Sequence, residues 1–169
     1  MIETPKSQVT VTESGSGRYS QRVAVGRHVL FADEPESSGG QDTDPSPYEY
    51  VLAGLGACTA ITLRMYVERH NWALRRITVE LQHEKIPAAD GASKIDHFHR
   101  TIYLEGDLTE EQRLRLFQIA ERCPVSETLR HAAIVDSKLA AASRLAPATS
   151  AGNATPDMRQ LNEADRTGD

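Results

Sequence analysis

The sequence has no uninterrupted apolar run long enough to predict a membrane span. Its longest apolar stretch, residues 51–63, is broken by glycines and threonines and is followed at once by Arg64. A spanning helix takes about 20 apolar residues, so a buried core helix is the better interpretation. The first residues, 1–6, are polar and lack the apolar region of a signal peptide. We therefore expect a cytoplasmic protein that has no membrane partner.

Clusters of basic residues are also missing. The 19 lysines and arginines are scattered along the chain, and the formal net charge is −5. Because a nucleic-acid surface usually shows a basic stripe, this pattern argues against a nucleic-acid partner. The composition, 39% hydrophobic and 25% charged, is typical of a globular domain. At 169 residues, we expect one domain over residues 1–144 and a disordered tail over 145–169, where large apolar residues almost disappear.

Cysteine is scarce, with only Cys58 and Cys123 in the chain. The pair lacks zinc-ligand spacing, and a reducing cytoplasm disfavours a structural disulfide. Two interpretations remain: buried apolar cysteines, which are common, or a redox pair.

His97 and His99 share one face of a predicted strand, but we identify no third ligand. We therefore expect no metal site and no cofactor.

Periodic patterns predict an α+β domain. Alternating apolar residues indicate short strands, and the segment between Asp33 and Pro47 is a long loop suggestive of function. We expect the loop carboxylates Asp33 and Glu34 to be solvated, and His83 to be a hydrogen-bonded core residue. The predicted strands cover 8–12, 19–25, 28–32, 77–84 and 96–105, with a last short strand over 132–135.

A central helix is predicted to begin after Ser46. Pro47 suits the first helical position and Glu49 completes a capping box, so the helix should run to about His70. Its first half is apolar nearly all round, which predicts that it is enclosed on several sides. Cys58 lies in the middle of this helix.

The second cysteine follows another predicted helix. Thr109 and Gln112 form a capping box, and the apolar face of this helix leads to Cys123. Pro124 should end the helix there, and Ser126 is placed to cap a short further helix. This face puts Cys123 on the core side of the fold, where Cys58 is also expected.

A redox role needs a thiolate, because the thiol itself is a poor nucleophile. In an apolar helix, Cys58 would be inert unless a cation lay beside it. Arginine suits that role because it stays charged and donates hydrogen bonds. A sulfenic acid formed at one cysteine condenses with a second thiol to give a disulfide. This requires Cα atoms within about 7 Å, so contact between Cys58 and Cys123 is plausible from the sequence but not established by it.

The two cysteine segments resemble those of the OsmC/Ohr family. Residues 45–66 are similar to the family's central helix, and residues 119–129 to its second cysteine segment. The resemblance covers roughly residues 9–137. Features that point to the OsmC-like branch are Asp33-Glu34-Pro35, Gly39-Gly40 and His83-Glu84-Lys85-Ile86.

The resemblance implies an OsmC-like fold, in which antiparallel sheets wrap around central helices in an intertwined homodimer. It implies reduction of organic hydroperoxides, with regeneration by dihydrolipoyl groups, as on a lipoylated protein, or by other dithiols. Cys58 matches the attacking cysteine and Cys123 the resolving one. Arg18 best matches the arginine that holds the thiolate, with Arg22 and Arg27 as competitors.

One position departs from the family pattern. Where Ohr proteins carry a glutamate that braces the arginine, this chain has Tyr48, and Glu49 comes one place later. One position turns a helical side chain by about 100°. Glu49 is then only a capping carboxylate, with Tyr48 lining the pocket. A non-catalytic module, either a redox-sensitive switch or a binder of apolar ligands, is the alternative function.

Overall fold

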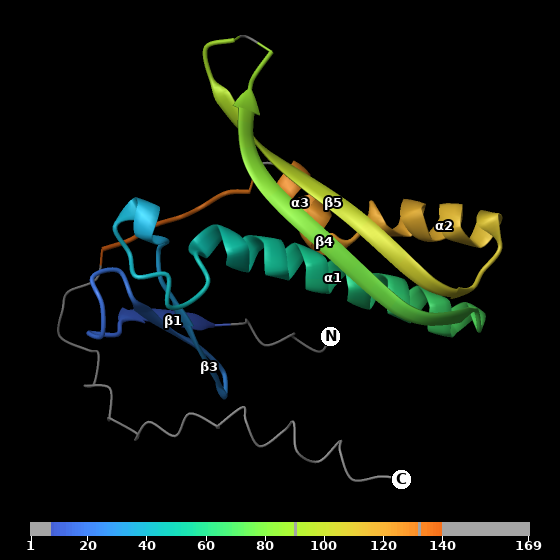
Figure 1. The fold of residues 1–169 in the computed structure, drawn as a ribbon, viewed down its shortest axis with the longest axis horizontal. Coiled ribbons are helices and arrows are strands. Elements are labelled where there is room, and N and C mark those ends of the chain that lie inside the picture. The colour runs from blue at the N-terminus through green and yellow to red at the C-terminus, as the bar shows by residue number, and fades with distance from the viewer. Residues whose placement is uncertain (1–7, 90, 132, 140–169) are drawn as a thin grey trace. The chain divides into compact units, whose positions relative to one another are not determined.

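A computed structural model describes residues 8–89, 91–131 and 133–139. It confirms the α+β class, with two antiparallel sheets and helices (Figure 1). The chain divides into two compact units, residues 1–133 and 134–169. The first unit contains β1 (Val9–Glu13), β2 (Gln21–Val25), β3 (His28–Ala32), the 3-10 helix η1 (Glu36–Ser38), α1 (Pro47–His70), β4 (Ala73–Pro87), β5 (Lys94–Asp107), α2 (Glu110–Ala120) and α3 (Pro124–Arg130).

The first sheet has the strand order β1-β2-β3 and is antiparallel throughout. Val9 pairs with Val25, and the β2–β3 hairpin pairs Val25 with His28. Gly26 has a φ of 57°, a conformation that suits glycine in a tight hairpin turn. The three strands and this turn are as predicted from the alternation.

The loop between β3 and α1 is organised around Asp33. This side chain is buried, and its Oδ2 accepts hydrogen bonds from Gln41 N at 3.0 Å and from Thr43 Oγ1 at 3.1 Å. The prediction that Asp33 is solvated is therefore wrong, because the loop's donors need a buried acceptor. A Cβ at Gly40 would lie 1.8 Å from the carbonyl oxygen of Glu34, so this close approach requires glycine.

Helix α1 begins and ends as predicted. Ser46 N donates to Glu49 Oε2 at 2.7 Å, and the reciprocal half of the capping box is also present. The helix ends at His70, and Asn71 follows in the left-handed conformation with a φ of 53°. Tyr50 of α1 donates a hydrogen bond to the carbonyl oxygen of Phe31.

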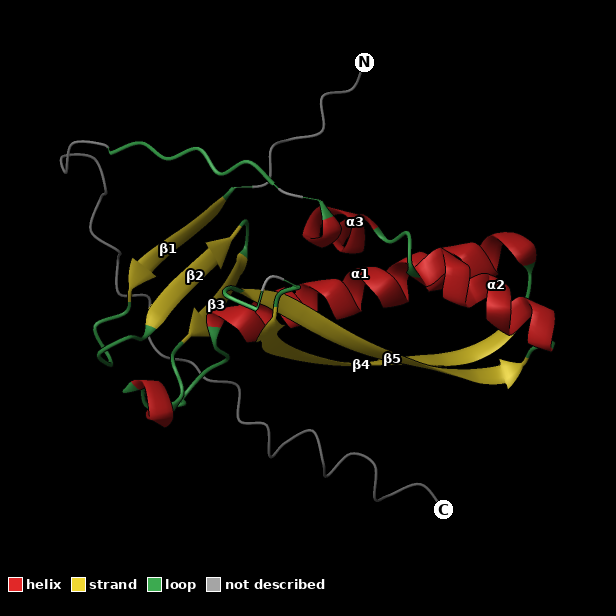
Figure 2. Cartoon of the chain, turned by 90° about the horizontal axis from the view of Figure 1, so that it is seen from above, coloured by secondary structure: helices red, strands yellow, loops and turns green. Residues whose placement is uncertain are grey.

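The second sheet is a long hairpin of β4 and β5, with a bulge between Leu74 and Arg76. Its register pairs Ile77 with Leu104 and places Leu81 opposite Arg100. The helices lie on one side of this hairpin (Figure 2). The core forms between α1, α2 and that face, and Tyr66 and Trp72 pack against it. Its buried members are Leu63, Val67, Leu74, Leu116 and Ala120.

A single stripe of α1 is buried in the chain. Leu55, Thr59, Leu63 and Val67 recur every fourth residue and are all buried, whereas Ile61 remains 59% exposed. Within one chain, therefore, α1 is covered along one stripe only, and the prediction that it is enclosed on several sides stays a prediction. By length and composition the whole helix is also apolar enough to cross a bilayer, a test that core helices of soluble proteins pass as well.

The end of α2 differs from the prediction. The helix stops at Ala120. The short further helix, α3, is capped by Cys123, so the prediction that Ser126 caps it is wrong. Cys123 Sγ accepts a hydrogen bond from Ser126 N, so the cysteine has the capping role that was predicted for Ser126. Residues 133–135 form no strand, and residue 132 and the predicted tail, 145–169, lie outside the described residues.

Candidate thiol active site

The structure brings the two cysteines together. Cys58, on α1, is half-buried, and Cys123, at the start of α3, is fully buried with 0% exposure. Both thiols are free. Thr59, the residue after Cys58, lies 3.5 Å from Cys123 Sγ, and the Cys58 side chain is one of the groups that lower the pKa of Cys123. The fold therefore brings the α1 segment that carries Cys58 up to Cys123, the proximity that disulfide formation needs.

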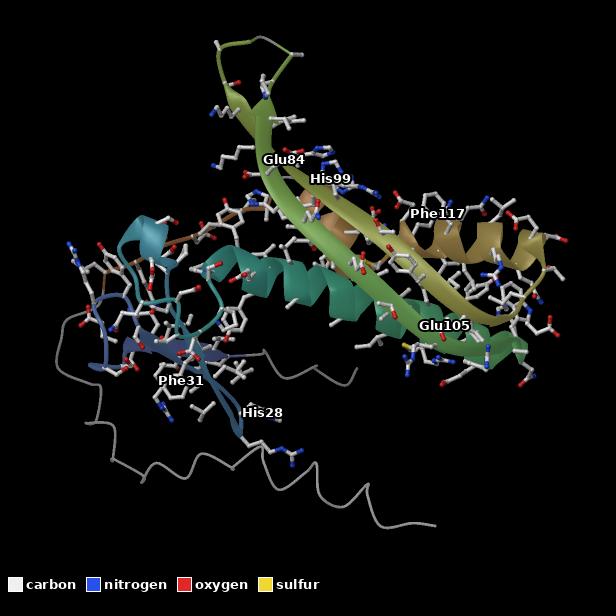
Figure 3. The ribbon with its side chains drawn as sticks, viewed as in Figure 1. His28, Phe31, Glu84, His99, Glu105 and Phe117 are labelled. Carbon is white, nitrogen blue, oxygen red and sulfur yellow. The ribbon has the colours of Figure 1, made fainter. Side chains whose placement is uncertain are left out.

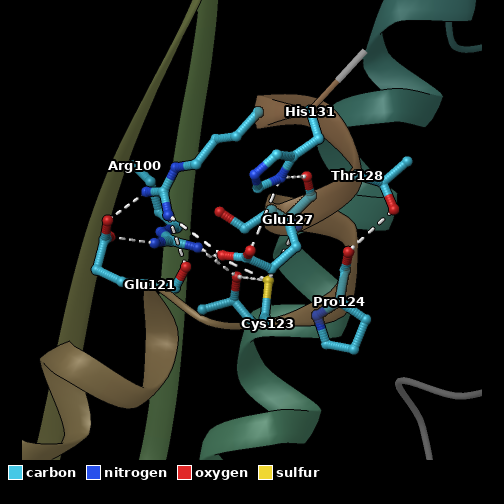
Figure 4. Close-up of polar contacts among 10 residues, drawn as sticks. Arg100, Glu121, Cys123, Pro124, Glu127, Thr128 and His131 are labelled. Atoms are coloured by element: carbon cyan, nitrogen blue, oxygen red, sulfur yellow. Dashed lines mark hydrogen bonds and ion pairs between the residues drawn. The ribbon is translucent and has the colours of Figure 1, made fainter. Parts of the chain in front are cut away.

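Cys123 lies among hydrogen-bonding groups from several elements (Figure 4). Its Sγ lies 3.5 Å from Thr59 Oγ1 of α1 and accepts from Ser126 N at 3.4 Å. Arg100 of β5 donates to the same sulfur through Nη1 at 3.9 Å. These groups meet only because α1, β5 and α3 pack around one sulfur.

These neighbours change the acidity of Cys123. Burial raises the pKa of its thiol, since a buried anion is poorly solvated. Hydrogen bonds from Thr59, from Ser126 N and from Cys58, with the charge of Arg100, outweigh burial, so the pKa of Cys123 falls below its usual value. A lowered pKa favours the thiolate, which is the nucleophilic form.

The hydroxyl of Thr59 can respond to the charge on Cys123. It donates to the carbonyl oxygen of Leu55 at 2.8 Å and accepts from Arg100 Nη1 at 2.9 Å. A hydroxyl has a single proton, so donating to a Cys123 thiolate means releasing Leu55. This exchange needs only a rotation of the hydroxyl proton, because the Leu55 carbonyl oxygen and Cys123 Sγ both lie within hydrogen-bonding distance of Thr59 Oγ1.

Arg100 is held in place by the carboxylate of Glu121. Its side chain is only 9% exposed, and its Nη2 lies 2.5 Å from Glu121 Oε1. Arg130 contacts the other carboxylate oxygen, Oε2, of Glu121 and donates to the Glu121 carbonyl oxygen at 2.7 Å. The carboxylate thus bridges two guanidinium groups and fixes the one that reaches the sulfur.

Sequence reasoning did not identify Arg100. The sequence pattern that could have identified it is an arginine at a core-facing position of an alternating strand. Arg100 lies on the same face of β5 as Ile102 and Leu104, whose side chains pack against the core. A charged residue in such a position needs a partner. Here the partners are Glu121, Thr59 and Cys123.

The predicted arginines lie elsewhere in the chain. Arg18 precedes β2, and its guanidinium carbon lies 5.1 Å from the centre of the Tyr19 ring. Arg22 is on β2 and Arg27 is at the following turn. None of the contacts described for this part of the chain joins the three to a cysteine, so the role of Arg18 stays a prediction.

Tyr48 and Glu49 occupy different environments. Tyr48 stacks on His83, with ring centroids 4.3 Å apart, and lines a cleft that Arg100 also lines. His83 is bonded to Asp96 at 2.8 Å, which confirms it as a hydrogen-bonded histidine. Glu49 serves as the capping carboxylate, and the hydrogen bond from Ser46 N lowers its pKa.

The open cleft next to Cys123 has a volume of about 980 Å³. Arg100 reaches both the cleft and the sulfur, so it connects the cleft to the buried thiol. Apolar side chains contribute much of its wall. The charged residues of the wall are Lys94, Asp96, Arg100, Glu121 and Arg130. The apolar and aromatic members are Tyr48, Val51, Ile95, Phe98, Phe117 and Leu129.

A second group of polar side chains lies on the hairpin (Figure 3). One ligand atom each from Glu84, His97 and His99 lies within 4.8 Å of the others. The sequence pattern revealed the two histidines but no third ligand, because only the strand register places Glu84 opposite His97. The prediction that a third ligand is lacking is therefore wrong.

The fold is shared with solved OsmC and organic hydroperoxide resistance proteins. An organic hydroperoxide resistance protein from Elizabethkingia anophelis is 21% identical, covering 77% of this chain and 91% of its own, with a TM-score of 0.58. The OsmC protein from Legionella pneumophila, also described as an organic hydroperoxide resistance protein, is 17% identical, with coverages of 77% and 91% and a TM-score of 0.59. An OsmC-like protein from Mycoplasma pneumoniae is 14% identical, with coverages of 74% and 87% and a TM-score of 0.61. At these identities the likeness shows the fold.

The chain thus has the α+β fold of OsmC and Ohr proteins, with Cys123 packed against the α1 segment that carries Cys58. The family model of OsmC-like proteins matches residues 39–138, more than half of the sequence. The chain belongs to the OsmC-like protein family, which confirms the resemblance seen in its cysteine segments. No curated protein matches it by sequence.

Proposed function

We propose that the protein is a thiol-dependent peroxidase that reduces organic hydroperoxides to alcohols, regenerated by a dithiol in a reducing cytoplasm. The observation that carries the proposal is the placement of two free thiols: Cys58 lies on α1 next to Thr59, and Thr59 and Arg100 both contact Cys123 Sγ. Arg100 also lines a cleft with an apolar wall. Similar folds occur in proteins that are named for organic hydroperoxide resistance. These names support the proposal and do not establish an activity for this chain.

The reaction needs both cysteines in sequence. The Cys58 thiolate attacks the distal oxygen of the hydroperoxide, the O–O bond breaks, and the leaving alkoxide takes a proton to become the alcohol. The Cys58 sulfenic acid then reacts with the Cys123 thiolate, forming the disulfide and releasing hydroxide, which is protonated to water. A dithiol, such as a dihydrolipoyl group, reduces the disulfide by exchange and is itself oxidised.

The cleft gives the proposal its substrate class. Its aromatic and aliphatic side chains suit the organic part of a hydroperoxide, and Arg100 offers donors for an oxygen. Hydrogen peroxide has no apolar part to bury there. We therefore expect a lower KM for cumene hydroperoxide than for hydrogen peroxide.

A homodimer is part of the same proposal. Val51, Ile61 and Met65 expose apolar side chains along α1, and a Cβ at Gly54 would meet nothing within 4 Å. Gly56, by contrast, is already close to the Leu81 side chain of its own chain. A second copy that covered α1 would bury this face, in the manner of large homodimer interfaces, and could bring Arg18 to the site.

The enzymatic test is dithiol-dependent loss of hydroperoxide. We expect saturable consumption of cumene hydroperoxide with dihydrolipoamide as reductant, and none with the Cys58→Ser variant. The Arg115→Gln variant, altered on exposed α2, should match the wild type. Consumption that stays linear with substrate, or that survives in Cys58→Ser, would refute the peroxidase.

The apolar wall of the cleft also favours the alternative of a non-catalytic module that binds apolar ligands. In that case the protein would bind the alcohol product or a fluorescent fatty acid saturably, yet consume no hydroperoxide. The same binding experiment, run with oxidised and reduced protein, would reveal a redox-sensitive switch.

A further inference from the structure

Arg100 and Thr59 converge on the sulfur of the second cysteine. We propose that Arg100 is a positioning residue that holds Cys123 as the resolving thiolate, so that disulfide formation and its later reduction both depend on it. This inference rests on the proposed peroxidase function. It places the action of Arg100 in disulfide formation, the second chemical step, and not in the attack on the peroxide.

The chemistry of both steps uses the same anion. In resolution, the Cys123 thiolate is the nucleophile toward the sulfur of the Cys58 sulfenic acid. In regeneration, the dithiol attacks Cys58, and Cys123 departs as a thiolate while the S–S bond breaks. A leaving thiol of lower pKa departs faster, so a group that stabilises this anion speeds the second step as well.

The geometry gives Arg100 a fixed direction. Nη1 reaches both Thr59 Oγ1 and Cys123 Sγ, while Nη2 is occupied by Glu121. Arg130 binds the same carboxylate from α3. A guanidinium has donors in a rigid planar fork, so anchoring one edge on Glu121 directs the other edge at the sulfur.

Burial makes the arrangement effective. The Arg100 side chain is 9% exposed and Cys123 is fully buried, so water screens their interaction less than it screens surface charges. The charged and titratable groups around the sulfur are Cys58 from α1, Arg100 from β5, Glu121 between α2 and α3, and Arg130 from α3.

The test is a single-turnover experiment with the Arg100→Gln and Arg100→Lys variants of the full chain. One equivalent of cumene hydroperoxide is added, the reaction is quenched with a thiol-alkylating reagent, and the species are resolved by mass spectrometry. We expect sulfenic acid formation at wild-type rate, followed by disulfide formation about tenfold slower in Arg100→Gln, because less of Cys123 would then be thiolate. Arg100→Lys should recover part of it.

Two controls separate this role from simple structural damage. Arg115→Gln, altered on the exposed side of α2, should leave both steps unchanged. The pH at which disulfide formation reaches half its maximum should move upward in Arg100→Gln, which damage to the fold alone would not produce. Slower sulfenic acid formation with normal resolution would overturn the proposal, because Arg100 would then serve Cys58.

The experiment also distinguishes failure of the peroxidase itself. If wild-type protein consumes no hydroperoxide, alkylation of Cys123 as a function of pH, in a Cys58→Ser background, still tests the arginine. An upward shift of that profile in Arg100→Gln supports the thiolate assignment without peroxidase activity. Identical profiles with and without Arg100 would overturn it.

A different observation, on the hairpin, carries a second inference. Glu84 on β4 faces His97 and His99 on β5, with His99 Nε2 at 2.9 Å and His97 Nδ1 at 3.7 Å from Glu84 Oε1. His97 Nδ1 is buried and has no hydrogen-bond partner among the described residues. From these positions we infer a divalent transition-metal site, for which Zn²⁺ is the best match.

The donor types suit zinc. Two imidazole nitrogens and one carboxylate form a three-ligand zinc site that leaves a position for water. Rigid strand pairing already holds the three side chains on one face, so binding requires only the replacement of the His99–Glu84 hydrogen bond by two metal bonds. The side chains are between 43% and 57% exposed, which gives a metal ion access.

Isothermal titration of the full chain with Zn²⁺ tests this site. We expect one saturable site per chain that is lost in His97→Ala and in Glu84→Gln, and retained in Gln82→Ala, which alters the neighbouring residue opposite His99. The titration is repeated in a Cys58→Ser, Cys123→Ser background. Loss of binding in that background, or retention in His97→Ala, would overturn the assignment, as would the absence of saturable binding.

Discussion

The guanidinium of Arg100 donates to Cys123 Sγ across 3.9 Å, from a strand that the sequence separates from the cysteine by a whole helix. Among the described residues, Arg100 is therefore the cation that contacts the cysteine pair, and the cysteine that it contacts is Cys123. The family resemblance instead makes Arg18 the arginine that holds the thiolate of Cys58. The two arginines make separable predictions, because each would affect a different step.

Thr59→Val tests the hydroxyl beside Cys123. The side chains have nearly the same shape, but valine neither donates to a thiolate nor accepts from Arg100 Nη1. We expect the pKa of Cys123 to rise and stability to fall by about 1–3 kcal/mol, the usual cost of leaving a buried donor unpaired. Alkylation of Cys123 against pH and urea unfolding measure the two effects. An unchanged alkylation profile would mean that Thr59 contributes nothing to the thiolate.

Glu121→Gln tests the bridge between two arginines. Burial raises the pKa of the Glu121 carboxyl, but hydrogen bonds and charge from Arg130 and Arg100 outweigh it, so the pKa lies below the usual 4.5. A lowered carboxyl pKa contributes stability that is complete above pH 4.5 and is lost as the pH falls through the folded value. We expect wild type to lose more stability than Glu121→Gln between pH 5 and pH 3, by about a few tenths of a kcal/mol to one. Parallel curves in thermal melts would contradict this.

Ile61→Lys tests the exposed face of α1. The side chain is 59% exposed in the chain, so lysine should fold normally in a monomer but would place a charge inside a dimer that covers α1. We expect sedimentation to show a dimer for wild type and a monomer for the variant. Leu114→Lys, equally exposed at 57% on α2, is the matched control. A wild-type monomer at micromolar concentration would count against the homodimer.

Arg18→Ala tests the arginine that the family resemblance assigns. We expect sulfenic acid formation to slow about tenfold or more, with little change in thermal stability because Arg18 contacts only the Tyr19 ring among the described residues. Stopped-flow measurement of the first step gives the result. A normal first step would move the assignment to Arg22 or Arg27.

Local signals made most of the secondary structure predictable. The capping boxes at Ser46 and Thr109 fixed where α1 and α2 begin, because they depend on residues three positions apart. The end of α2 was predicted too late. Pro124 disfavours the helical conformation only of the residue before it, whereas the helix already stops at Ala120. The family and both cysteines were likewise evident from contiguous segments.

The surroundings of the cysteines could not be predicted in the same way. Arg100 reaches Cys123 only because the β4–β5 register places it on the face that packs against α1 and α3. Glu84 meets His97 for the same reason. Register depends on contacts between distant segments, and a shift of one residue would have turned each side chain to the opposite face.

The most direct test of the peroxidase is intact-mass analysis after one equivalent of cumene hydroperoxide. Wild-type protein should lose two hydrogens as Cys58 and Cys123 form a disulfide. Cys123→Ser should instead gain oxygen at Cys58, first as the sulfenic and then, with more peroxide, as the sulfinic acid. Cys58→Ser should remain unmodified. Oxidation of Cys123 in Cys58→Ser would reverse the two roles, and an unchanged wild-type mass would contradict the peroxidase outright.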